Sequence, residues 1–298
     1  MAVVRVPSWS TVLVGSVAAA LMADSVNSRI VSVLKKLFVF LLVLNWRSLP
    51  FAWHIRFWSL IPKLYVKIWS KGPEKAMAIA RNPYEVRTVT KGRVNWDSTD
   101  YNQHMSNSSY AKVCDEARFA FLLELIGPAF GQGVWSPLAS TSFSFFREIP
   151  AGAAYEIEMH LLSHDDKWLY YIGRFTTAPR RGSTERTLNA VVFSRSCFKL
   201  RGSRLSIPPA RVLSFSGLGP DRSNYERSLR LIKEKKARKW IQYGAEAVAK
   251  KNGKALSGKT VEGEEGWDHE GLEMYEDRRL KGLPVAERFG DVTGWENL

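Results

Sequence analysis

The stretch Asp-Ser-Thr-Asp-Tyr-Asn-Gln-His-Met-Ser-Asn-Ser-Ser-Tyr at residues 97–110 decides how this chain is read. Asp100, Asn102 and His104 alternate in it, so a carboxylate, an amide and an imidazole share one short polar turn. Apolar residues at spacings of three and four follow from Tyr110 to Leu125, which predicts a long helix with one buried face. Of the three polar residues, Asp100 is the one that carries a charge at neutral pH and can act as a base or nucleophile.

The start of this helix adds a second chemical element to the turn. Backbone N–H groups in a first helical turn are free, and the helix dipole is positive there. Ser106, Asn107 and Ser108 lie at that point and are the candidate oxyanion and substrate-binding residues. Donors so placed stabilise negative charge on a carbonyl oxygen. The turn and helix therefore predict a site that cleaves an acyl ester or thioester.

Simpler interpretations of the same residues stay open. Asp and Asn before a helix are ordinary capping residues, and a single histidine in a turn is more often hydrogen-bonded than catalytic. One His with one Asp and one Asn has too few ligands for a typical metal site, and the chain has no Gly-x-Ser-x-Gly turn. We expect no metal and no cofactor. Cys114 lies on the apolar helix face, where core packing is the safer interpretation.

The segments around the helix read as strands. Tyr84 to Val94 alternates in the manner of a half-buried strand, and Gly127-Pro128 ends the helix. Four more strand-like runs follow: Leu138–Ile149, Tyr155–Ser163, Trp168–Thr177 and Leu188–Leu200. This order predicts an α+β fold in which an antiparallel sheet wraps around one long helix.

The N-terminal region differs from the rest. Residues 9–23 are mostly small and apolar, residues 37–44 form an unbroken apolar run, and residues 46–69 interleave aromatic and basic side chains. The apolar stretch from Ile30 to Leu44 is short for a full span of about 20 residues. The aromatic and basic part is typical of a helix in the headgroup region. We expect a membrane anchor, with a signal peptide or a helix packed on the domain as the alternatives.

The sequence divides into five segments, and its charge bears on the partner. We expect an anchor or interfacial helices over 1–70, a linker over 71–82, the sheet-and-helix domain over 83–202, a basic helical extension over 203–252 and a flexible tail over 253–298. The net charge of +14 favours an anionic partner, but no nucleic-acid motif is present, so we expect no nucleic acid. Two cysteines exclude a disulfide framework.

Residues 100–110 resemble the Asp-x-Asn-x-His-(Val/Met)-Asn-Asn-x-x-Tyr segment of hotdog-fold acyl thioesterases, a superfamily that includes the 4-hydroxybenzoyl-CoA thioesterases. They also resemble the membrane-anchored thioesterase-like proteins of animals and fungi. Asp115-Glu116-Ala117-Arg118 fits the acidic-x-Ala-Arg continuation of the helix. The resemblance implies the hotdog fold, a homodimer paired along sheet edges and an acyl tunnel at the interface. It implies Asp100 as base or nucleophile, with Asn102 and His104 as helpers and Asn107 as a helix-start hydrogen bonder.

Three positions depart from the family pattern. Ser106 replaces the first Asn of the Asn-Asn pair, and Gln103 stands where many bacterial relatives have Gly. Plant relatives carry a further catalytic Glu on the strand after the helix, where this chain has Ser144. Glu148 falls on the same strand face and is the candidate substitute.

These observations lead to one function and one alternative. We expect hydrolysis of an acyl-CoA or acyl-carrier-protein thioester at a membrane surface, with membrane lipid as a further partner. The alternative is a non-catalytic hotdog module that binds acyl-CoA or lipid. The expected location is a membrane such as the endoplasmic reticulum, with the catalytic domain facing the cytosol because basic residues are denser after Leu44 than before Ile30. The candidates for holding coenzyme A phosphates are Arg147, Arg174, Arg180, Arg181 and Arg201.

Overall fold

The computed structural model describes residues 28–180, 182–203, 205–243 and 272–290. The chain divides into two compact units, Met1–Trp53 with Asn95–Asp97 and His54–Val94 with Ser98–Leu298. The sequence analysis placed the end of the anchor at residue 70, whereas the units divide earlier, between Trp53 and His54. The second unit contains the sheet and the long helix.

The described part of the first unit contains an apolar helix. Helix α2 (Ser28–Leu44) is followed by the single turn η1 (Trp46–Ser48). The large apolar side chains of α2 are exposed around the helix: Ile30, Val33, Leu37, Phe38, Val39, Phe40, Leu41 and Val43. The apolar run at residues 9–23 lies outside the described residues.

Among the residues that the structure describes, no helix combines the length and the apolar character needed to cross a membrane. A membrane-spanning form of the anchor that we expected over residues 1–70 is therefore not supported within these residues.

The second unit carries a seven-stranded antiparallel sheet. Its main strands are β1 (Thr88–Arg93), β3 (Leu138–Phe145), β4 (Ala154–His164), β5 (Trp168–Thr177) and β6 (Thr187–Leu200). The order is β1-β4-β5-β6, with β3 also pairing with β6. The short strands β2 (Val134–Trp135) and β7 (Ser206–Ile207) pair with the far end of β6. Among the described strands, β3 pairs with β6 alone, so its other edge is open.

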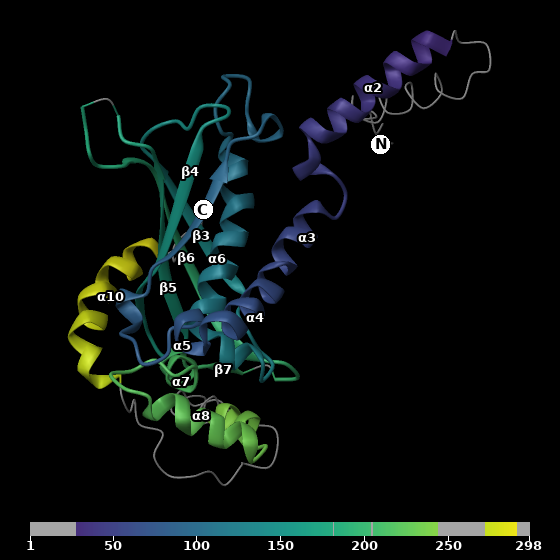
Figure 1. Ribbon diagram of the computed structural model, residues 1–298. Coiled ribbons are helices and arrows are strands. Elements are labelled where there is room, and N and C mark those ends of the chain that lie inside the picture. The colour runs from purple at the N-terminus through teal and green to yellow at the C-terminus, as the bar shows by residue number, and fades with distance from the viewer. Residues whose placement is uncertain (1–27, 181, 204, 244–271, 291–298) are drawn as a thin grey trace, which may run out of the picture. The chain divides into compact units, whose positions relative to one another are not determined.

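Helix α6 (Asn107–Phe130) lies along one face of this sheet, as Figure 1 shows. Tyr110, Cys114, Ala117, Phe121 and Leu125 are buried on it, which is the face that the spacing predicted. Ile126 leaves helical geometry directly before Gly127-Pro128, although helical structure resumes as far as Phe130. The predicted sheet around one long helix is therefore present.

The core extends further than the predicted domain end at residue 202. Helix α7 (Pro209–Phe215) is buried throughout, and α8 (Ser223–Lys233) adds Leu231 to the same hydrophobic core. Lys235 lies within the basic helical extension that we predicted over residues 203–252, and its positive φ of 59° interrupts the helix. The chain turns there, and helical structure resumes at residues 237–243. Residues 205–243 of the basic extension are thus part of the folded domain.

The tail expected to be flexible contains a folded helix. Helix α10 (Glu276–Gly290), preceded by the turn η4 (Glu273–Tyr275), lies beside the face of the sheet opposite α6 (Figure 1). Ala286 packs there with Leu162, Tyr170 and Phe193. These apolar side chains come from β4, β5 and β6, so the helix gains its stability from tertiary burial that the polar tail sequence alone did not reveal. Residues 244–271 and 291–298 lie outside the description.

Helices α3 (Ala52–Trp58) and α4 (Leu60–Lys71) attach the start of the second unit to α6. Arg56 forms an ion pair with Glu116 at 2.7 Å, and the rings of Phe57 and Phe119 stack at 4.2 Å. A short helix α5 (Pro73–Ala76) follows, and its Glu74 pairs with Arg222 next to α8. Residues 54–76 therefore pack on the domain.

Candidate functional site

The polar turn is a tight bend held at several backbone points. The Asp100 N–H donates to the His104 carbonyl at 2.9 Å, and the Asn102 N–H donates to Asp100 Oδ1 at 2.9 Å. Gln103 has a positive φ of 62°, a conformation that favours glycine. The N–H of Met105 donates to the carbonyl of Ile149 at 2.8 Å. The backbone thus fixes the bend against residues 149–151.

His104 lies between two carboxylates. Its Nδ1 is 3.3 Å from Asp100 Oδ2, and its Nε2 is 3.2 Å from Glu148 Oε1. The side chains of Asp100 and His104 are mostly covered, with 28% and 19% exposed, whereas that of Glu148 is 73% exposed. The three residues come from the bend and from the segment after β3. They form a short row of acid, imidazole and acid.

The start of α6 adjoins the base of the bend. The Ser106 N–H donates to the Ser98 carbonyl at 2.9 Å, and Ser106 is the N-cap residue. Its hydroxyl lies 3.0 Å from the hydroxyls of both Ser108 and Ser109. Asn107 is exposed and begins the helix. The predicted oxyanion residues therefore occupy the first turn, where backbone N–H groups are available.

Ser144 occupies the position where plant relatives carry a further catalytic Glu, and Glu148 is the candidate substitute. The surroundings of these two residues differ. Ser144 lies within β3 opposite Val191 and is exposed. Glu148 lies three residues beyond the end of β3 and reaches His104. The structure thus brings Glu148, and not Ser144, to the histidine. Asn102 is exposed, and it is its backbone N–H that contacts Asp100.

Aromatic rings border this site on the sheet side. Tyr110 on α6 is buried and packs edge-on against Phe145 at 5.0 Å. Burial, followed by the charge of Glu148, raises the pKa of Tyr110 to about 12, so the phenol stays protonated. Phe145 stacks on Phe143 at 5.9 Å and, like Phe146, remains exposed to a large extent. An apolar surface therefore lies next to the carboxylates.

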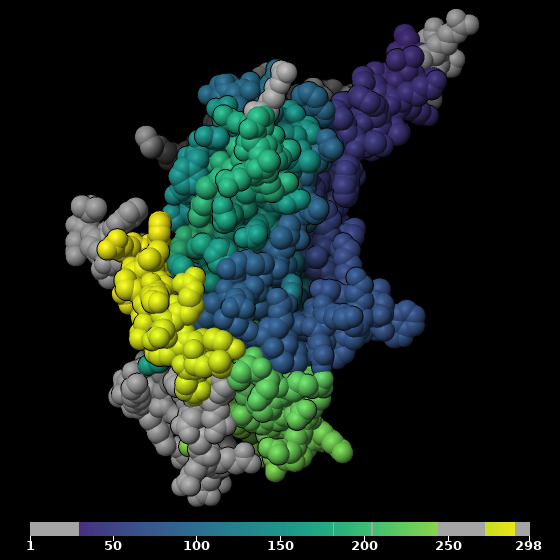
Figure 2. Space-filling model, turned by 60° about the vertical axis from the view of Figure 1, so that its left-hand side comes forward, coloured from purple at the N-terminus to yellow at the C-terminus, as the bar shows by residue number. Residues whose placement is uncertain are grey.

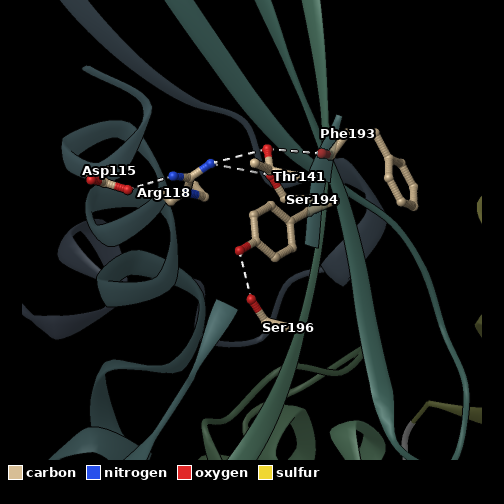
Figure 3. Close-up of polar contacts among 7 residues, drawn as sticks. Asp115, Arg118, Thr141, Phe193, Ser194 and Ser196 are labelled. Atoms are coloured by element: carbon tan, nitrogen blue, oxygen red, sulfur yellow. Dashed lines mark hydrogen bonds and ion pairs between the residues drawn. The ribbon is translucent and has the colours of Figure 1, made fainter. Parts of the chain in front are cut away.

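A buried arginine joins α6 to the sheet behind the site. Figure 3 shows Arg118 reaching from the helix toward Thr141 and Ser194, with Asp115 at its other end. The ion pair between Arg118 and Asp115 measures 2.5 Å, and the Thr141 hydroxyl donates to the Phe193 carbonyl at 3.2 Å. Arg118 is 6% exposed, so its charge depends on these partners. The acidic-x-Ala-Arg motif is thus a link between α6, β3 and β6.

Other predicted residues lie elsewhere. Burial raises the pKa of the Cys114 thiol to about 12, which leaves it protonated in the core. Arg147 is exposed beside Glu148. Arg174 on β5 lies opposite Glu158 on β4, and its charge contributes to lowering the pKa of His160. Arg181 lies outside the described residues. Within the described ranges, no cluster of His, Cys, Asp and Glu is arranged to hold a metal ion.

The comparison with known families decides what this domain is. The family model described as "Thioesterase-like superfamily" matches residues 94–215. That range contains the bend, α6, strands β2 to β7 and α7. Residues 94–215 are a thioesterase-like domain. Its sheet and helix form the hotdog-type thioesterase fold.

Similar proteins occur in fungi and in an animal. The probable thioesterase atnL of Emericella nidulans is 25% identical over 294 residues, which cover 85% of this chain and 84% of that protein. The probable thioesterase YBR096W of Saccharomyces cerevisiae is 24% identical, covering 63% of this chain and 81% of its own length. Protein THEM6 of Danio rerio is 28% identical, covering 43% of this chain and 58% of that protein.

These similarities confirm two predictions made from the sequence, the superfamily and the enzyme class of thioesterase. They assign no role to individual residues of the thioesterase-like domain. Asp100, Asn102, His104 and the residues at the helix start therefore stay predictions. Glu148 was named from its strand face alone. Its contact with His104 could not be derived from sequence, because the bend after β3 sets its position.

Proposed function

We propose that this chain hydrolyses the thioester of an acyl-CoA or acyl-carrier protein, with Asp100 as the reacting carboxylate. The observation that supports this is the placement of Asp100, with its partner His104, on a rigid bend at the start of α6. Asp100 is partly covered, so it keeps access to a substrate while its two oxygens are oriented. His104 Nδ1 contacts Oδ2 of Asp100, and the Asn102 N–H donates to Oδ1.

Two reaction sequences fit this geometry. As a general base, Asp100 takes a proton from water while the water oxygen attacks the thioester carbon, and the C–S bond then breaks. As a nucleophile, a carboxylate oxygen attacks that carbon, the thiolate leaves, and water cleaves the resulting anhydride. In both, N–H groups of the first turn of α6 stabilise the oxyanion. The thiolate takes up a proton to complete the reaction.

The surroundings of Asp100 support an acyl thioester as the substrate. The rings of Phe143, Phe145 and Tyr110 offer apolar contact for an acyl chain. Arg147 is the basic residue next to Glu148, and it is the arginine candidate that we place near the phosphates of a coenzyme A or phosphopantetheine group.

We further propose a homodimer paired through β3. A strand that pairs on one side alone presents unpaired backbone groups, which readily add a second strand. Leu138 and Phe145 on β3 are exposed, by 42% and 44%. A second copy along this edge would bring its own apolar surface to the site. The molar mass in solution, measured by light scattering, tests this directly.

Membrane association is proposed on the exposed apolar side chains. Ile55, Trp58, Tyr65 and Trp69 follow one another at spacings of three, seven and four along α3 and α4, and each is more than half exposed. Lys63 lies among them in the sequence, and Lys71 follows Trp69. Aromatic side chains mixed with lysines are typical of helices in the lipid headgroup region. The exposed residues of α2 support the same proposal. Under it, the catalytic domain faces the cytosol.

Hydrolysis is tested with the full chain and acyl-CoA substrates of several chain lengths. The Asp100→Asn variant should lose about a hundredfold or more of kcat, the contribution typical of a positioned base. Asp277→Asn, at an exposed position of α10, is the matched control and should retain activity. In a single turnover in isotopically labelled water, label in Asp100 would identify the nucleophilic route.

The alternative function has its own signature in the same assay. A wild-type chain that hydrolyses none of the substrates but unfolds at a higher temperature with acyl-CoA would be a binding module. Equal activity in Asp100→Asn and wild type would instead remove Asp100 from the proposal.

A further inference from the structure

Three arginines gather on the outer face of the sheet, the face opposite α6. Arg87 directly precedes β1, Arg174 lies on β5, and Arg278 lies on α10. Figure 2 shows α10, in yellow, lying against the rest of the second unit. All three side chains are exposed. This arginine cluster therefore presents positive charge to solvent on a face that the proposed hydrolysis does not use.

The sheet register brings the two arginines of the strands to His160 on β4. Strands β1 and β4 pair in antiparallel register, and Arg87 continues that register to the position opposite His160. Because Met159 is buried in the core, its neighbour His160 points to the outer face. Arg174 pairs with Glu158, two residues from His160 on the same face. Opposite and diagonal neighbours in adjacent strands lie about 5–8 Å apart, within reach of long side chains.

The charges of all three arginines act on His160. Burial, followed by the charges of Arg87, Arg174 and Arg278, lowers the pKa of His160 to about 4, so the imidazole is neutral at neutral pH. Because a charge acts more weakly as distance grows, this effect places the guanidinium of Arg278 near the same ring. Nδ1 of His160 is buried and has no hydrogen-bond partner among the described residues. The half-buried ring thus marks the centre of the arginine cluster.

No carboxylate neutralises this cluster. Within the described ranges, neither Arg87 nor Arg174 nor Arg278 forms an ion pair. Arg56, by contrast, pairs with Glu116 at 2.7 Å. Like charges that converge without an opposite charge raise the free energy of the folded chain, and a bound anion would remove that cost.

Arg87 is held by neutral partners. Its Nη1 donates to the carbonyl of Tyr84 at 2.7 Å and to that of Val86 at 3.1 Å. These bonds orient the side chain without removing its charge. Glu158 offsets part of the positive charge, although no ion pair joins it to the opposite Arg174 within the described structure. The arginine cluster is therefore positioned and remains positive.

A phosphate group fits this arrangement. Guanidinium groups form paired, charge-assisted hydrogen bonds with phosphate oxygens, and donors from three separate elements can surround a tetrahedral anion. The proposed membrane contact uses α3 and α4, and α3 packs on α6, on the other side of the sheet. The arginine cluster faces away from that side. A ligand dissolved in water therefore has better access to it than a lipid headgroup.

We propose that the arginine cluster binds the phosphate group of a small, water-soluble phosphate monoester. The phosphate oxygens accept hydrogen bonds from the guanidinium groups of Arg87, Arg174 and Arg278. Because these donors come from β1, β5 and α10, the bound ligand links α10 to the sheet. Strand β4 rises about 20 Å from Ala154, near the bend, to His160. The site is thus separate from Asp100 and does not depend on the proposed hydrolysis.

Calorimetric titration of the full chain with propyl phosphate, at constant ionic strength, tests the proposal. Saturable binding is expected, while propanol, which lacks the phosphate, should show none. Arg174→Gln and Arg278→Gln should each weaken binding about tenfold, the effect of losing hydrogen bonds between charged groups. Arg288→Gln is the matched control, because it removes the same charge from an exposed position of α10 and should bind as wild type.

Nuclear magnetic resonance of the His160 ring locates the site. Its signals should shift when propyl phosphate binds. Without ligand, the pKa of His160 should rise above about 4 in Arg174→Gln, because that variant removes one of the charges that lower it, and should stay unchanged in Arg288→Gln. These two measurements check the geometry of the arginine cluster independently of affinity.

Vesicles that contain phosphatidic acid separate a soluble ligand from a lipid headgroup, because this lipid carries the same phosphate monoester. Arg174→Gln/Arg278→Gln should bind these vesicles as the wild type does. Weaker vesicle binding by this double variant would replace the soluble ligand with a lipid. Equal binding of propyl phosphate and propanol, no saturable binding, or an equal loss in Arg288→Gln would overturn the proposal.

Discussion

His104 is the residue that organises the candidate site, because each of its ring nitrogens faces a carboxylate. A neutral imidazole has one N–H and can donate to Asp100 or to Glu148, but not to both. A protonated imidazole donates to both. The ring therefore joins the two carboxylates, and its Nδ1 side orients Asp100.

Glu148→Gln should lower kcat only about two- to fivefold, because the exposed Glu148 interacts with His104 through water-screened charge. Acyl-CoA hydrolysis by purified variants measures this. The exposed Glu287→Gln on α10 is the matched control and should behave as wild type. A loss as large as that of Asp100→Asn would mean that Glu148 takes part in the chemistry itself.

His160 predicts a pH effect on stability. Burial, followed by the charges of Arg87, Arg174 and Arg278, lowers its pKa from 6.5 to about 4. Between these values the unfolded chain binds a proton and the folded chain does not, so stability falls as pH drops through this window. Urea unfolding should show that His160→Gln loses less stability than wild type between pH 6.5 and pH 4. A His54→Gln variant, at an exposed position, should follow the wild type.

The bend shows how far single residues could be predicted. The alternation of Asp100, Asn102 and His104 correctly indicated a shared turn, and Asp100 and His104 are in contact. The side chain of Asn102 is exposed instead of directed at Asp100, because Gln103 turns the backbone through a positive φ. Local spacing predicts which residues share a loop, but a loop's dihedral angles decide which of them meet.

At the scale of elements, α6 and the strands β4, β5 and β6 could be identified because each has buried residues of its own. Strand β1 was identified from its alternation of half-buried and exposed residues, and β3, which has no buried residue, from its run of Ser and Phe. Helix α10 was missed for the opposite reason. Its sequence is mostly polar, and only a few residues, such as Ala286 and Leu283, touch the sheet. The partner surface on Leu162, Tyr170 and Phe193 forms only after the sheet has folded. Such an element cannot be found from its own composition.

Gly282 is the position where this docking can be tested. A Cβ added there would lie 2.3 Å from the Leu162 carbonyl oxygen, which is backbone and cannot move aside easily. Gly→Ala in a free helix stabilises by about 1 kcal/mol, so a loss in Gly282→Ala would report the contact with the sheet. We expect faster proteolysis within α10 and a lower free energy of unfolding by about 1–3 kcal/mol.

Lys281→Ala is the matched control, because Lys281 precedes Gly282 in the same helix and is exposed. It should leave both the cleavage rate and the free energy of unfolding unchanged. If Gly282→Ala proves as stable as wild type, then α10 does not pack on β4 as described.

For the whole molecule, the proposed membrane association rests on apolar surface that the folded chain leaves in water. Val33 and Phe40 lie on α2 with 63% and 59% of their surface exposed. Glutamate at both positions would place charge where apolar side chains would contact lipid, at a cost that reaches about 2.5 kcal/mol or more per acidic residue deep in the bilayer. Binding to lipid vesicles, measured by flotation of the full chain, should fall at least tenfold in Val33→Glu/Phe40→Glu.

The matched control replaces two exposed apolar residues on the second unit, Val89 on β1 and Leu280 on α10, with glutamate. It adds the same charge, so general repulsion from anionic lipid would weaken both double variants equally, whereas insertion of α2 would weaken only the first. Hydrolysis of a short, water-soluble acyl thioester should be the same in both, because neither pair lies at Asp100. Undiminished flotation of Val33→Glu/Phe40→Glu would exclude α2 as the membrane contact.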